Sequence, residues 1–170
     1  MSAAAPLGGV ASGTSTADIL RAQERLLLPH MLHLYERPLV LVDAEGVRVR
    51  DAEGREYLDL FAGILTTSVG HCHPRVVAAI TEQARHLGHV STLYATLPQV
   101  EAASKLVEIA PDGLTRTFFT TSGTEAVEAA LVIACVATGR SEIVALRHAY
   151  HGRSLTALAL TANSGWKPLA

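Results

Sequence analysis

The fold of this chain is most constrained by residues 120–139, with the sequence TTSGTEAVEAALVIACVATG. Four apolar side chains recur at the spacing of one helix face, and these are Val127, Leu131, Ala134 and Cys135. Ser122 or Thr124 can cap the start of this helix, and Gly139 can end it. The apolar residues 116–121 before it read as a strand. A strand that turns directly into a helix presents free N–H groups at the turn, and these attract an anion, most naturally a phosphate.

A second apolar segment follows the helix and indicates a parallel sheet. Residues 142–146 (EIVAL) read as a short strand, and a polar loop comes directly after them. Alternation of strands and helices is typical of α/β proteins, in which ligands bind beyond the carboxyl ends of the strands. The 122–124 turn and the 150–152 loop both lie at such ends. The sequence therefore predicts one site made by two consecutive strands.

The N-terminal part has a different pattern. Residues 1–16 carry no charge and read as a disordered leader, and an amphipathic helix is expected over residues 17–28, before Pro29. Short strands alternate with two DAEG turns and predict a small antiparallel meander, with strands at 39–42, 47–51 and 57–60 and turns at 43–46 and 51–54.

Helices are also expected between the meander and the central turn. Pro74 can occupy the first position of a helix that Gly88 ends. Its expected buried stripe comprises Val76, Val77, Ile80, Ala84 and Leu87. A second amphipathic helix covers about residues 99–109, and residues 154–161 fit either a helix or a strand.

Composition excludes several classes of function. The net charge of −2 gives no electrostatic basis for binding nucleic acid or an anionic membrane. No apolar run reaches the roughly 18 residues that a membrane span requires. Cys72 and Cys135 lack a C-x-x-C partner, which favours free thiols in a reducing, cytoplasmic compartment.

The residues alone leave several alternatives open. Neither a G-x-x-x-x-G-K-[ST] loop nor a G-x-G-x-x-G fingerprint occurs, which disfavours a nucleotide-binding domain. The Ser122 turn can be an ordinary helix cap as well as a phosphate site. Arg153 can be a solvated loop residue. His71 and His73 flank Cys72 at a metal-binding spacing, but no third ligand is placed nearby, so no metal site is expected.

Several motifs in one order resemble the class III aminotransferases, which are fold type I enzymes dependent on pyridoxal 5′-phosphate (PLP). The motifs are DAEGREYLD, GHCHP, STLY, SGTEAVEAAL, TGR and AYHGRS. They are most similar to the branch with alanine–glyoxylate and β-amino acid:pyruvate transaminases. The resemblance implies an incomplete α/β fold, with part of a small domain at residues 17–60 and the first part of the PLP-binding large domain at residues 61–170.

The resemblance also implies roles for individual residues. The phosphate-binding turn of the family matches Ser122, Gly123 and Thr124. Tyr150 matches the aromatic residue that stacks on the cofactor ring, and His151 and Gly152 shape its loop. Arg153 matches an arginine that binds the substrate carboxylate. The expected substrates are an amino acid and a keto acid such as pyruvate or glyoxylate, and the complete enzyme is expected to be a homodimer.

The catalytic residues of the family have no match here. Transamination needs a lysine that binds the cofactor aldehyde and an acid that protonates the pyridine nitrogen. Lys105 and Lys167 lie in no such motif, and no aspartate follows Tyr150. We therefore expect an N-terminal fragment that does not transaminate alone and whose apolar faces are partly uncovered. The alternative is a non-catalytic module that binds the PLP phosphate or dimerises.

Overall fold

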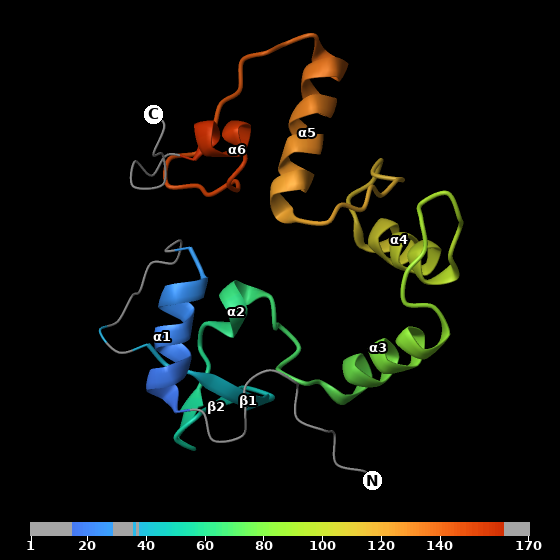
Figure 1. The fold of residues 1–170 in the computed structure, drawn as a ribbon. Coiled ribbons are helices and arrows are strands. Elements are labelled where there is room, and N and C mark those ends of the chain that lie inside the picture. Colours follow the sequence, from blue (N-terminus) through green and yellow to red (C-terminus); the bar gives the residue numbers. More distant parts are fainter. Residues whose placement is uncertain (1–14, 29–35, 37, 162–170) are drawn as a thin grey trace. The chain divides into compact units, whose positions relative to one another are not determined.

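The computed structural model describes residues 15–28, 36 and 38–161 and divides into two units, Met1–Ser91 and Thr92–Ala170. Figure 1 shows the elements in chain order, which are α1 (Thr16–Leu26), β1 (Leu41–Glu45), β2 (Arg48–Asp51), β3 (Glu56–Leu58), α2 (Ala62–Leu65), α3 (Pro74–His86), α4 (Leu97–Ile109), α5 (Gly123–Thr138) and α6 (Leu155–Leu160). The division between residues 60 and 61 concerns the domains of a complete fold and stays a prediction. Of the predicted leader, residues 1–14 lie outside the described residues, whereas Ser15 caps α1 and Thr16 begins it.

The antiparallel meander is present in the N-terminal unit. Its strands pair in the order β1-β2-β3, with Ala44 opposite Val49 and Val49 opposite Tyr57. The first turn differs from the prediction, because β1 continues to Glu45 and the chain reverses after it. Gly46 takes a φ of +56° there, a left-handed conformation that glycine adopts at little cost.

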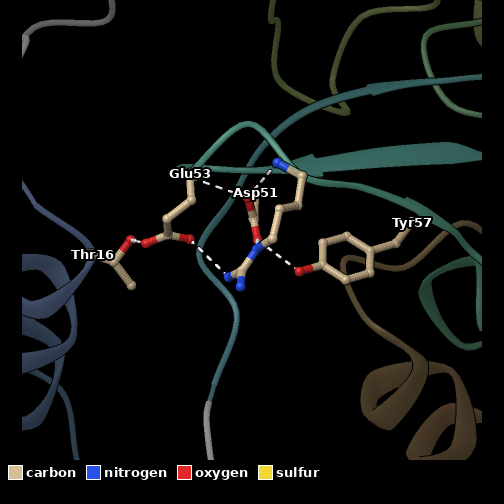
Figure 2. A network of polar contacts seen from close by, with 5 residues as sticks. Thr16, Asp51, Glu53 and Tyr57 are labelled. Atoms are coloured by element: carbon tan, nitrogen blue, oxygen red, sulfur yellow. Dashed lines mark hydrogen bonds and ion pairs between the residues drawn. The ribbon is translucent and has the colours of Figure 1, made fainter.

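A buried carboxylate organises the second turn (Figure 2). Asp51 is 1% exposed and accepts hydrogen bonds from the N–H groups of Glu53 and Arg55, at 3.0 and 2.8 Å. Arg55 Nε and the Tyr57 hydroxyl each lie 2.7 Å from its other oxygen. Burial alone would raise the pKa of Asp51, but the hydrogen bonds from Tyr57 and Arg55 outweigh it and lower this pKa to about 2. The Thr16 hydroxyl donates to Glu53 and so links the start of α1 to this turn.

The segment after the meander is irregular. Positive φ values of 47–65° make α2 a left-handed turn, at Ala62, Gly63, Ile64 and Leu65. Asp59 accepts the N–H groups of Phe61 and Ala62 at 2.9 Å and contacts His71 Nε2 at 2.7 Å. The hydrogen bond to His71 lowers the pKa of Asp59. His71 also forms a backbone bridge with Gly46, which ties this segment to the meander.

The helix at residue 74 begins as predicted, but the prediction that its apolar stripe is buried is wrong. Pro74 is the first residue of α3, yet no side chain of this helix is buried. Val76, Val77 and Ile80 are 44%, 48% and 64% exposed. The apolar stripe exists in the sequence, but its side chains are largely exposed in the described part of the chain. Helix α1 lies close to its predicted range of residues 17–28 and begins with a capping box between Ser15 and Asp18.

The two strands of the expected parallel sheet are not formed. Residues 116–121 and 142–146 have no ladder hydrogen bonds, and Phe118 and Val144 are 75% and 98% exposed. A strand is held by bonds to a neighbouring strand, and in the described part of the chain all strand pairing belongs to the meander. Residues 154–161, left open between helix and strand, form α6, which contacts α5. No helix within the described ranges is long and apolar enough to cross a membrane.

Candidate anion site at the start of helix α5

The sequence predicts the start of α5 correctly. Ser122 has an extended backbone (φ −154°, ψ 160°), and its Oγ accepts the N–H of Glu125 at 3.1 Å. Its carbonyl accepts the first helical bond from Ala126 at 3.0 Å. The N–H groups of Gly123 and Thr124 meet no acceptor among the described residues. Two donors and the positive end of a 16-residue helix are therefore available to an anion.

The acidic side chains of the first two turns bond away from these donors. The Glu125 carboxylate accepts the hydroxyl and the N–H of Thr121, the latter at 2.8 Å, and these bonds lower the pKa of Glu125. Glu128 accepts the hydroxyl of Ser154. Because both carboxylates already have partners, neither is needed to satisfy the Gly123 and Thr124 amides.

The 150–154 loop packs closely against the first turn of α5. Gly152 is buried with a φ of +127°, and a Cβ on it would lie 2.2 Å from Thr124 Oγ1. Only glycine permits this approach. The N–H of Arg153 lies 3.4 Å from the same Thr124 oxygen. Since Thr124 Oγ1 accepts from Arg153, its own hydrogen is free to be donated to a bound anion.

Three further side chains of the loop differ in their surroundings. Tyr150 is 52% exposed, and the Arg153 guanidinium forms no ion pair with any described residue. His151 has a buried Nε2 with no hydrogen-bond partner in the described part of the chain. An unpartnered buried polar atom costs about 1–3 kcal/mol. A group that bonds to His151 Nε2 would remove this cost.

A small buried cluster anchors the loop from its other side. The N–H of His151 donates to Thr161 Oγ1 at 3.3 Å, and that hydroxyl donates to the carbonyl of Ala157 at 2.9 Å. Thr161 and Ala157 are both fully buried. No local pattern in the sequence predicts the contact between His151 and Thr161, because it joins residues ten positions apart.

The predicted site residues thus lie in one unit, and the structure joins the turn to the loop through Thr124, Gly152 and Arg153. The first turn of α5 fits a phosphorylated ligand, because two free N–H groups and one hydroxyl hydrogen lie there while the acidic side chains are engaged. Elsewhere, no group of three or more potential metal ligands lies among the residues described.

A comparison with protein families decides the identity of this fold. A family model described as aminotransferase class III matches residues 33–169. The chain belongs to the class III aminotransferases. This family is PLP-dependent, as the motif resemblance implies.

Two relatives illustrate the match of this class III chain. Acetylornithine aminotransferase of Methanopyrus kandleri is 46% identical over 144 residues, which cover 84% of this chain and 36% of that protein. The alanine–glyoxylate aminotransferase 2 homolog 2, mitochondrial, of Arabidopsis thaliana is 40% identical over 156 residues, covering 92% of this chain and 33% of that protein. The class III chain therefore spans about a third of the length of these relatives.

A solved structure confirms the fold class. Taurine:2-oxoglutarate aminotransferase from Bifidobacterium kashiwanohense, in complex with PLP and glutamate, matches with a TM-score of 0.81 and 26% identity. The match covers 91% of this class III chain and 35% of that one. The fold is accordingly part of the transaminase fold type I, and the meander is the part of its sheet structure that the described residues form by themselves.

Proposed function

We propose that the start of α5 and the 150–154 loop hold PLP in an enzyme that transfers an amino group from an amino acid to a keto acid. The observation that carries this proposal is the pair of unpartnered N–H groups at Gly123 and Thr124, beneath a loop that only Gly152 allows to dock. Pyruvate and glyoxylate are the proposed keto acids, since the Arabidopsis relative is named for glyoxylate.

The proposal gives each residue of the site a physical role. Ser122 caps the helix and holds the turn, while the Gly123 and Thr124 amides and the Thr124 hydroxyl bind the phosphate. Tyr150 stacks on the pyridine ring, and the free Arg153 guanidinium binds a substrate carboxylate through two hydrogen bonds.

His151 completes this group as a cofactor-binding residue. Its buried Nε2 gains a partner when the site is filled.

The cofactor supplies the electron sink for the reaction, and the described residues supply binding and orientation. Lys105 does not suit the role of the lysine that holds the cofactor aldehyde, because it is 79% exposed on α4 and paired with Glu108 at 2.9 Å. We therefore propose that these 170 residues do not transaminate by themselves. The complete enzyme is proposed to be a cytoplasmic homodimer, in keeping with the two free cysteines.

The exposed position of Lys105 also favours a second candidate function, a non-catalytic module that binds the PLP phosphate or dimerises. The coding DNA downstream of codon 170 separates the two. A reading frame that continues to an aspartate at a strand end and a later lysine supports the enzyme. A stop codon at that point supports the module.

Gly123 allows a direct test of the phosphate site. It is the first residue of α5, a position that favours proline, and Ser122 before it already has the extended backbone that proline requires. Gly123→Pro removes one N–H donor without disturbing the helix. We expect about a tenfold or larger loss of affinity for pyridoxine 5′-phosphate by calorimetry, because one charge-assisted hydrogen bond is lost.

Gly123→Ala is the matched control, since a Cβ at this position meets nothing within 4 Å and the N–H remains. It should bind pyridoxine 5′-phosphate as the unmodified chain does. This ligand lacks an aldehyde, so attachment to surface lysines does not contribute. Equal affinities of the proline and alanine variants would contradict the assigned phosphate site.

A further inference from the structure

A second contact joins α5 to the loop, one turn beyond Thr124. The Ser154 hydroxyl donates to a carboxylate oxygen of Glu128, 26 residues away, and both residues are partly buried. Neither residue belongs to the phosphate-binding turn.

The Ser154 hydroxyl performs two tasks at once. It accepts the N–H of Ala157 at 3.3 Å, which caps α6, and it donates its hydrogen to Glu128. A cap alone needs only an acceptor, which Asp or Asn supplies equally well. The donor function of Ser154 is therefore specific to the contact with Glu128.

Glu128 and Thr124 lie four residues apart and so share one face of α5. Thr124 holds Gly152 and the Arg153 N–H, and Glu128 holds Ser154. The two points of attachment lie within residues 152–154 of the loop. Its orientation determines where Tyr150 and the Arg153 guanidinium lie relative to the phosphate donors.

We propose that Glu128 and Ser154 are positioning residues. They fix the 150–154 loop at the phosphate site, so that the Tyr150 ring and the carboxylate-binding Arg153 guanidinium are held at the right distance from it. This inference rests on the proposed function of the site. It assigns to Glu128 an effect on ligand affinity without contact with the ligand.

Moving the carboxylate from position 128 to position 154 in two steps tests the proposal. Ser154→Asp keeps an acceptor for the α6 cap but places a second carboxylate against Glu128. It should weaken binding of pyridoxine 5′-phosphate about tenfold. In the protein without ligand, it should speed hydrogen exchange of the Arg153 backbone amide by a similar factor. Adding Glu128→Gln gives the introduced carboxylate an amide donor, and the double variant should recover to within about threefold of the unmodified chain.

Two single variants exclude a general charge effect. Ser141→Asp adds the same charge at an exposed position after α5 and should leave both measurements unchanged. Glu128→Gln alone keeps an acceptor for Ser154 and should change affinity by less than about threefold. The recovery in the double variant must therefore exceed the gain from Glu128→Gln alone. Additive effects would overturn the proposal.

The two measurements separate this inference from the proposed function. If the unmodified chain does not bind pyridoxine 5′-phosphate, the proposed function fails, and amide exchange still shows whether Glu128 and Ser154 hold the loop. If Ser154→Asp leaves Arg153 amide exchange unchanged, the pair does not hold the loop and the inference fails. Faster exchange without a change in affinity also refutes positioning.

Discussion

Replacing Gly152 by alanine is expected to open the contact between α5 and α6. The new Cβ would lie 2.2 Å from Thr124 Oγ1 and 2.9 Å from Thr124 Cβ, on a backbone with a φ of +127°. Steric overlap and backbone strain each cost about 1–3 kcal/mol. The loop leaves Thr124 because no flexible side-chain end can move aside to relieve the clash. Exchange of the Thr161 amide should accelerate at least about a hundredfold, and affinity for pyridoxine 5′-phosphate should fall.

Two variants serve as controls for this result. Gly139→Ala imposes a left-handed φ of +69° with nothing within 4 Å, so it carries strain without overlap and should cost about 1–2 kcal/mol at the end of α5. Thr124→Ala combined with Gly152→Ala removes the Oγ1 and Cγ2 atoms and should restore part of the protection. If Gly152→Ala behaves like Gly139→Ala, the close approach of the loop to Thr124 is not a determinant of this contact.

Substituting Asp51 by asparagine is expected to have the largest effect in the N-terminal unit. Asp51 receives four hydrogen bonds, including one from the charged Arg55 and one from Tyr57. An amide NH₂ in place of one oxygen cannot accept, so at least one donor loses its partner on this buried side chain. We expect a loss of about 10 °C or more in melting temperature, followed by circular dichroism.

The pH dependence of this difference has a definite sign. The folded pKa of Asp51, about 2, lies below the ordinary value of 3.8. Its stabilisation is therefore complete above about pH 4 and disappears as the pH falls toward 2. The melting temperatures of the unmodified chain and of Asp51→Asn should converge over this range. Asp43→Asn, at a 64% exposed side chain of β1, is the matched control and should change little. A constant difference between the two melting temperatures from pH 7 to pH 2 would show that the Asp51 charge does not cause the stabilisation.

The sequence predicts those parts of the fold that depend on neighbouring residues. Helix α5 follows from an apolar period, a serine cap and a terminal glycine, all within 18 positions. The meander follows from alternation and turn residues, although the first turn is displaced to Gly46. Each of these signals acts through local backbone hydrogen bonds or dihedral preferences.

The segments that differ from prediction depend on partners distant in sequence. Residues 116–121 and 142–146 have the composition of strands, but a strand forms only against another strand, and the described residues offer neither segment one. The apolar stripe of α3 is exposed for a similar reason. The left-handed turn of α2 was also not predictable, since alanine, isoleucine and leucine rarely adopt positive φ.

The candidate site shows the same division. The sequence predicts a site at Ser122, Gly123 and Thr124 because the turn and the helix adjoin, and the structure has the helix start there. The sequence pattern places the 150–152 loop beside the turn, but it gives Tyr150 and Arg153 their roles only through family resemblance. Nothing in the sequence indicates the contacts from Thr124 and Glu128 to the loop. Those contacts join residues 26–29 positions apart, and no periodicity or turn chemistry specifies them.

The proposed function depends on phosphate binding by the first turn of α5, and amide resonances test this binding most directly. Pyridoxine 5′-phosphate and pyridoxine differ only by the phosphate and are added separately to ¹⁵N-labelled protein. We predict saturable shifts of the Gly123 and Thr124 amide resonances with pyridoxine 5′-phosphate and no such shifts with pyridoxine at the same concentration. Equal responses to both ligands, or shifts confined to residues outside the α5 turn and the 150–154 loop, would contradict the account.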